Sequence, residues 1–186
     1  SSATTMSAIA AALGGSKGTL WAYFPSKEEL FTAVIDHATT TFRAQLLETL
    51  TPDGEIVPTL RNFGLRLVDK VISPEALALH RLIVAEAGRF PELGRIFYER
   101  GPRITVALLG DFLEGAMERG QLRKDEPTDA AHFLMQMCMA RSQQKLQLGL
   151  SEEIGADEIS AEVDRALDLF MRAYAPETAP TQPLSA

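Results

Sequence analysis

Apolar residues recur at helical spacing along almost the whole chain, and no segment alternates apolar and polar residues as a strand does. Proline and glycine mark the points where one helix ends and the next begins. The pattern therefore predicts an all-α protein. At 186 residues the chain is long enough to bury a sizeable core.

The break at "TPDGE" separates residues 1–50 from a larger helical region over residues 51–175. An irregular tail over residues 176–186, which contains three prolines, is expected after it. In the first part, a long helix of about 24 residues opens at Ser26, which forms a capping box with Glu29. The helices expected in the second part cover residues 57–72, 74–88, 92–100, 102–120, 130–148 and 158–174.

Two short helices precede the long one, with a glycine-containing turn between them in "LGGSKG". This arrangement is typical of a helix-turn-helix, whose second helix lies in the DNA major groove, although an ordinary helical hairpin in a core has the same shape. In the second short helix, Leu20 and Phe24 account for the packing, and the opposite face carries Lys17, Thr19, Trp21 and Tyr23. Stiff, polar-tipped side chains on an outward face favour the DNA-binding interpretation.

The segment "TTMSAIAAALGGSKGTLWAYFPSKEELF", residues 4–31, resembles the DNA-binding domain of the TetR family of transcriptional regulators. The matching residues are Ile9, Ala10, Gly14, Ser16, Gly18, Phe24 and Lys27. The stretch "RLIVAEAGRFPELGRIFYERGP", residues 81–102, is similar to the regulatory domain of the AefR-like subgroup. Members of the family carry one more helix before the matching segment, so we expect the sequence to be a truncated or partial form of a longer protein.

The resemblance assigns roles to individual residues of the motif. Lys17 and Thr19 are expected at base edges or the nearest phosphates, Gly18 allows close approach of the backbone, and Ala22 can contact a thymine methyl group. Ser16, which caps the recognition helix, is also expected at the DNA. The remaining residues are predicted to contact phosphates: Thr5, Trp21, Tyr23 and Lys27.

A single helix-turn-helix makes few base contacts, so the resemblance implies a homodimer that reads a palindromic operator. The last two long helices are the expected interface, with internal core of one chain as the alternative. The residues predicted there are Ala131, Leu134, Cys138, Arg141, Ile159, Val163, Leu167, Phe170 and Tyr174.

Bulky apolar residues in the middle region have the composition of a ligand pocket. The resemblance implies that a small apolar or amphipathic effector binds there and releases the protein, most simply a repressor, from DNA. His80 and Glu86 could orient a polar ligand there, while core packing is the alternative for the apolar residues. The residues predicted to line the pocket are Phe63, Leu67, His80, Ile83, Glu86, Phe90, Phe97, Phe112, Phe133 and Met137.

Composition and motifs also limit the kind of DNA site that the chain can carry and argue against other classes of function. The net charge is −7, so a DNA site must be local rather than a broad basic face. The sequence contains no catalytic motif, which predicts a protein that is not an enzyme and has no cofactor. Its cysteine and histidine residues do not have the spacing of a metal site, so no metal is expected. The single cysteine and the lack of a long apolar run predict a cytoplasmic protein. The main alternative to a regulator is a helical protein that binds a small molecule and no DNA.

Overall fold

The computed structural model describes residues 24–176, which form helices without any strand. The all-α prediction is confirmed for this part of the chain. The helices are α3 (Lys27–Thr49), α4 (Ile56–Val71), α5 (Pro74–Ala87), α6 (Pro91–Arg100), α7 (Pro102–Glu118), α8 (Pro127–Met139), α9 (Ser142–Gln147) and α10 (Ala156–Tyr174).

Two of the expected helix starts are visible as side-chain caps. The Ser26 hydroxyl accepts a hydrogen bond from the Glu29 N–H at 3.1 Å, which fixes the start of α3. At α5 the Ser73 hydroxyl accepts from the Ala76 N–H at 3.3 Å, and Pro74 occupies the first turn, where its missing N–H costs no hydrogen bond.

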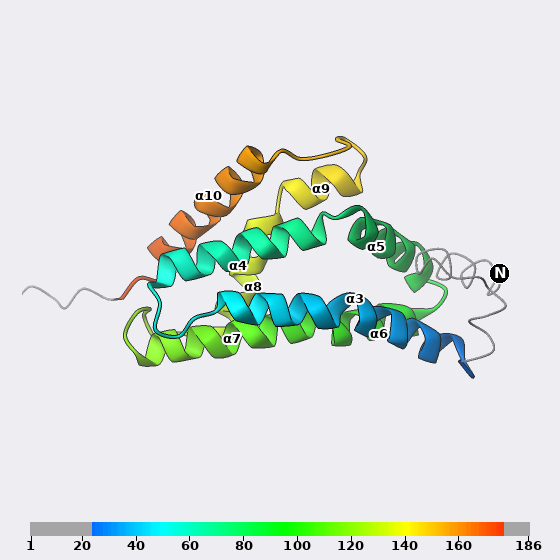
Figure 1. The fold of residues 1–186 in the computed structure, drawn as a ribbon, viewed down its shortest axis with the longest axis horizontal. Helices are drawn as coiled ribbons and strands as arrows, with labels where there is room; N and C mark the ends of the chain where they lie inside the picture. The colour runs from blue at the N-terminus through cyan, green and yellow to red at the C-terminus, as the bar shows by residue number, and fades with distance from the viewer. Residues whose placement is uncertain (1–23, 177–186) are drawn as a thin grey trace, which may run out of the picture.

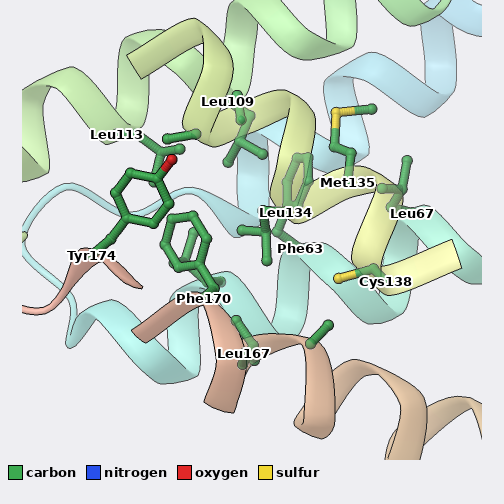
Figure 2. Close-up of a cluster of buried hydrophobic side chains, with 14 of the residues drawn as sticks. Phe63, Leu67, Leu109, Leu113, Leu134, Met135, Cys138, Leu167, Phe170 and Tyr174 are labelled. Atoms are coloured by element: carbon green, nitrogen blue, oxygen red, sulfur yellow. The ribbon is translucent and has the colours of Figure 1, made fainter. Parts of the chain in front are cut away.

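The larger core joins α4, α7, α8 and α10 (Figure 2). Phe63 of α4, Leu109 of α7 and Phe170 of α10 are completely buried, and Leu134 of α8 is 1% exposed. The rings of Phe170 and Tyr174 stack with their centroids 4.6 Å apart, one turn apart on α10. Burial of several large apolar side chains from four helices supplies the main stabilisation of this region.

A smaller core forms where α3 packs against α5 and α6. Leu30, Phe31 and Ile35 of α3 meet Ile83 of α5 and Leu93 of α6. These helices gather at the end of the molecule from which α3 begins, whereas α10 covers the other end (Figure 1). The expected domain boundary at residue 50 thus falls at the end of a helix that packs directly against later helices.

The expected continuous helix over residues 130–148 is wrong, because the chain turns at Ala140 and Arg141 and continues as the separate helix α9. The Glu162 carboxylate of α10 accepts the N–H groups of Arg141 at 2.6 Å and Ser142 at 3.1 Å, and also the Ser142 hydroxyl. A carboxylate from another helix therefore satisfies the free N–H groups at the start of α9, which lets the chain change direction there.

Candidate functional site

Most residues predicted to contact DNA lie outside the described residues, and they stay predictions: Thr5, Ser16, Lys17, Gly18, Thr19, Trp21, Ala22 and Tyr23. Lys27 is described, in the first turn of α3. The residue is only 8% exposed, and its Nζ lies 3.1 Å from the centroid of the Phe90 ring. In this conformation the ammonium group faces an aromatic ring rather than the surface position expected of a phosphate contact.

A cavity of about 460 Å³ opens between α3, α4 and α5. Its volume falls in the range of sites for small organic ligands. Its apolar wall consists of Val34, Ala38, Phe42, Ala76 and Leu79. Three of these residues belong to α3, so a molecule in the cavity lies directly against the helix that continues from the predicted DNA-binding motif.

The polar wall of the same cavity offers several kinds of hydrogen-bonding group. Lys70 of α4 supplies a cation, Glu75 of α5 a carboxylate, and His37 of α3 an imidazole; Thr41 and Gln45 add a hydroxyl and an amide. The Lys70 Nζ lies 5.9 Å from the centroid of the Phe42 ring. An aromatic surface beside a cation suits a flat ring that carries hydroxyl or acidic groups.

The sequence does not show that the long helix α3 lines a cavity in addition to linking two parts of the chain. Val34, Ala38 and Phe42 form part of the predicted apolar stripe, but a stripe does not distinguish packing against protein from lining a cavity. Lys70 and Glu75 carry no such signal, because charged residues near helix ends are common on any surface.

The ten residues predicted to line an effector pocket do not gather around one cavity. Phe63 and Leu67 are buried in the larger core, with Phe112 and Met137 packed against it, while Ile83 belongs to the smaller core together with Phe90 and Phe97. Phe133 is 56% exposed on the surface of α8, and Glu86 is half-buried on α5. Core packing, the alternative interpretation, therefore describes most of the apolar members.

His80 has a structural role in this arrangement. Its ring meets the Phe97 ring edge to face, with centroids 6.1 Å apart, and its Nδ1 lies 3.3 Å from the Gln147 amide nitrogen of α9. Burial lowers the pKa of His80, which keeps the imidazole neutral at physiological pH. His80 thus links α5, α6 and α9 rather than lining the cavity.

Seven of the nine residues predicted for a dimer interface are buried within the single chain: Ala131, Leu134, Cys138, Val163, Leu167, Phe170 and Tyr174. They fill the larger core because their stripe faces α4 and α7 (Figure 2). Ile159 is half-buried and Arg141 is exposed. These seven side chains offer no surface to a second chain, so the alternative of internal core applies to them.

The opposite faces of α8 and α10 carry apolar side chains that the single chain leaves uncovered. Phe133 of α8 is 56% exposed and Leu169 of α10 is 41% exposed. Between the two helices lies a groove of about 300 Å³ lined by Met137, Ala140, Arg141, Glu158, Ala161, Glu162, Arg165, Ala166 and Leu169. An apolar patch of this kind on a helix pair is typical of a protein contact.

Two further features are absent from residues 24–176. None of the helices there combines the length and apolarity required to cross a membrane. Across the same residues, histidine, cysteine and carboxylate side chains nowhere form a group of three that could hold a metal ion.

An all-helical fold, in which a long helix continues from a predicted helix-turn-helix segment and lines a cavity, is typical of a transcriptional regulator. Two family models match the sequence. The model of bacterial regulatory proteins of the tetR family matches residues 2–34, and that of the AefR-like transcriptional repressor, C-terminal domain, matches residues 58–176. The chain therefore belongs to the TetR family of transcriptional regulators.

Solved structures agree with this assignment. A protein described as a TetR-family transcriptional regulator from Mesorhizobium loti is 26% identical, with a TM-score of 0.79 over 91% of this chain and 86% of that one. The flavonoid-responsive regulator FrrA is 34% identical, with a TM-score of 0.75 over 91% of this chain and 85% of that one. A TetR transcriptional regulator from Agrobacterium tumefaciens is 25% identical, with a TM-score of 0.66 over 90% of this chain and 82% of that one. A comparison with curated protein sequences finds no match.

Proposed function

We propose that this regulator is a repressor that binds a palindromic operator as a homodimer and leaves it when a small effector occupies the cavity between α3, α4 and α5. The observation that carries the proposal is the position of the cavity. Val34, Ala38 and Phe42 form part of its wall, and the same helix begins at Lys27, inside the segment that matches the DNA-binding family model. An effector there contacts the helix that leads to the DNA-binding segment.

The effector that fits this cavity is a flat aromatic molecule with several hydroxyl groups. Phe42 and Leu79 provide apolar contact for a ring, and Lys70, Glu75 and His37 provide partners for its polar substituents. FrrA, which is 34% identical, is named for its response to flavonoids, and flavonoids have this chemistry. Moving the operator-bound fraction from 99% to 1% requires about 5.5 kcal/mol of differential affinity, which two cavities in a dimer could share.

For the operator, the roles assigned to the recognition helix are kept as proposals. Lys17 and Thr19 read base edges or adjacent phosphates, Ala22 contacts a thymine methyl group, and Trp21 and Tyr23 hold phosphates. Two such helices related by two-fold symmetry must lie about 34–36 Å apart to enter successive turns of the major groove. The protein therefore acts where the DNA is, in the cytoplasm.

The dimer contact that we propose uses the outward faces of α8 and α10. Phe133, Met137 and Leu169 supply its apolar part, and Arg141 and Arg165 lie beside the groove. This face replaces the buried residues predicted from the sequence, because a symmetric contact needs side chains that a single chain leaves exposed.

Mobility-shift titration tests the repressor proposal. The duplex is the DNA upstream of the protein's own gene, and the effector probe is a flavonoid aglycone. Ala38→Trp fills the cavity, while Ala44→Trp places the same side chain at an exposed position of α3 outside it. We expect both variants to bind DNA and the aglycone to release the wild type and Ala44→Trp, but not Ala38→Trp.

Other outcomes would contradict parts of this proposal. Release of Ala38→Trp at the wild-type aglycone concentration would show that the effector binds elsewhere. A protein that binds the aglycone but no duplex, neither its own upstream DNA nor any from a random pool, would support the alternative of a helical ligand-binding protein without DNA function.

A further inference from the structure

Lys27 is an unusual lysine, because long cationic side chains are almost never buried without a partner. It is 8% exposed, and its Nζ lies 3.1 Å from the centroid of the Phe90 ring. The negative face of an aromatic ring attracts an ammonium group, and more strongly when water is excluded. The Phe90 ring therefore accounts for the buried position of the Lys27 charge.

Phe90 is held firmly by its own backbone. It lies in the short connection between α5 and α6, where its N–H donates to the Glu86 carbonyl at 2.8 Å and its carbonyl accepts from the Leu93 N–H at 3.0 Å. Pro91 follows and restricts the conformation of Phe90. The ring is thus presented to Lys27 by a fixed turn rather than by a loose loop.

Burial against Phe90 conflicts with the contact that the motif predicts for Lys27. A lysine that binds a DNA phosphate must bring its ammonium group to the surface, where the backbone of the duplex can approach it. At 8% exposure, with the ammonium group against a ring face, Lys27 does not offer this contact. The structure therefore shows Lys27 in a position that is incompatible with its expected role on DNA.

We propose that Phe90 competes with an operator phosphate for Lys27, so that the turn between α5 and α6 holds the regulator in its released form. This inference rests on the proposed function, because it needs an operator for the competition. Binding to DNA draws the ammonium group off the ring, and restoring the contact between Lys27 and Phe90 favours release.

A second cation near Phe90 weakens the contact between Lys27 and the ring, so that a DNA phosphate can replace it. The Arg89 guanidinium carbon lies 5.6 Å from the centroid of the same ring, so two cations share one aromatic group. Repulsion between like charges weakens the pair, whereas DNA phosphates attract both cations.

The Phe90 contact also connects to the proposed effector cavity. Val34 and Leu79 line that cavity, and both pack in the smaller core against which Phe90 packs. An effector therefore touches the same cluster of side chains that positions the Phe90 ring. Occupancy of the cavity can stabilise this cluster and, with it, the Lys27 contact.

The test compares full-length variants on a labelled duplex selected by the wild-type protein from a random-sequence pool. Phe90→Leu keeps an apolar side chain but removes the ring, Phe90→Tyr keeps the ring, and Phe97→Leu removes a different ring of the same core. We expect Phe90→Leu to bind the duplex roughly 2- to 30-fold more tightly, the range of a cation–π contact converted to affinity. Phe90→Tyr and Phe97→Leu should bind like the wild type.

Two further measurements separate the contact from general destabilisation. In a Lys27→Gln background, Phe90→Leu should no longer change the affinity for the duplex. Without DNA, acetylation of Lys27 by an amine-reactive ester, followed by mass spectrometry, should be faster in Phe90→Leu than in the wild type and Phe97→Leu.

The outcomes distinguish this inference from the proposed function. Unchanged affinity and unchanged Lys27 acetylation in Phe90→Leu would overturn the competition while leaving operator binding intact. If neither the wild type nor any variant binds a duplex, the proposed function fails and the competition fails with it.

Discussion

Gly64 of α4 lies close against side chains of α8 and α10. A Cβ atom added there would be 3.0 Å from Val163 Cγ1 and 3.2 Å from Cys138 Sγ, and both neighbours are essentially unexposed. We expect Gly64→Ala to lower the free energy of unfolding by about 1–3 kcal/mol, because overpacking outweighs the gain of about 1 kcal/mol in helix propensity. Urea denaturation followed by circular dichroism measures the change.

Gly94, within α6, is the matched control for Gly64. Its added Cβ would meet only the Ala87 Cβ at 3.6 Å, an ordinary contact. Gly94→Ala should therefore raise the free energy of unfolding by about 0.5–1 kcal/mol. Equal effects of the two substitutions would mean that the helices around Gly64 can move apart.

The Cys138 thiol should make stability depend on alkaline pH. Burial, with a smaller contribution from the Glu162 charge, raises the pKa of Cys138 to about 12. The thiol ionises near pH 9 in the unfolded chain but only near pH 12 in the folded chain. Unfolding therefore releases a proton at pH values between 9 and 12. The stabilising effect of the neutral thiol is thus complete below pH 9 and is lost as the pH rises towards 12.

Urea titrations of the wild type and Cys138→Ala between pH 7 and pH 11 check this dependence. We expect the difference in stability between the two proteins to shrink above pH 9. The native thiol should also fail to react with a disulfide reagent at pH 8 until urea unfolds the chain. Rapid reaction of the folded protein would show that Cys138 is accessible.

Glu162 of α10 caps the start of the short helix α9. Its carboxylate accepts the N–H groups of Arg141 and Ser142 from a different helix. Glu162→Ala should lower the free energy of unfolding by about 1–3 kcal/mol, because it leaves these N–H groups without an acceptor. Hydrogen exchange of residues 142–147 should become faster.

Glu158, one turn earlier on α10, provides the comparison for Glu162. It pairs with Lys145 of α9 at 2.5 Å, but both side chains are more than 40% exposed. Surface ion pairs contribute about 1 kcal/mol or less. Glu158→Ala should therefore have little effect on the free energy of unfolding or on the hydrogen-exchange rate of α9. If the two substitutions have the same effect, general attraction between α9 and α10, rather than capping, holds α9 in place.

The break before α9 illustrates what sequence patterns can predict about elements and what they miss. Helix starts at Ser26 and Ser73 followed from local signals, because the capping side chain lies three residues from the N–H that it binds. The break at Ala140 and Arg141 depends on a carboxylate twenty residues away on another helix. No local rule contains that partner, so the stretch was predicted as one helix.

The same limit applies to the candidate site. The motif identified Lys27, but its burial depends on Phe90, which approaches only when α3 and the turn before α6 pack together. The sequence pattern also contains the apolar stripe of α8, but periodicity does not tell whether Leu134 and Cys138 face their own chain or another chain. The informative signal was that α8 is apolar on a second side too, with Phe133 and Met137 one turn apart.

The exposed apolar faces of α8 and α10 should hold two copies of the chain together. Phe133 and Leu169 are 56% and 41% exposed. A few residues near the centre of an interface each cost about 2 kcal/mol or more when truncated, about 30-fold in affinity, and a charge placed in such an apolar contact is also left without a partner. Phe133→Glu with Leu169→Glu should therefore convert the proposed dimer to a monomer at micromolar concentration, as measured by analytical ultracentrifugation.

Val84 makes the assembly prediction specific to one surface. It is 64% exposed on α5, which lies at the other end of the molecule from α10 (Figure 1). Val84→Glu adds the same charge to an apolar surface position and should leave the dimer intact. Because two recognition helices must bind together, the double variant should also lose affinity for a palindromic duplex while its circular dichroism stays helical. Dissociation by Val84→Glu instead would place the interface on α5.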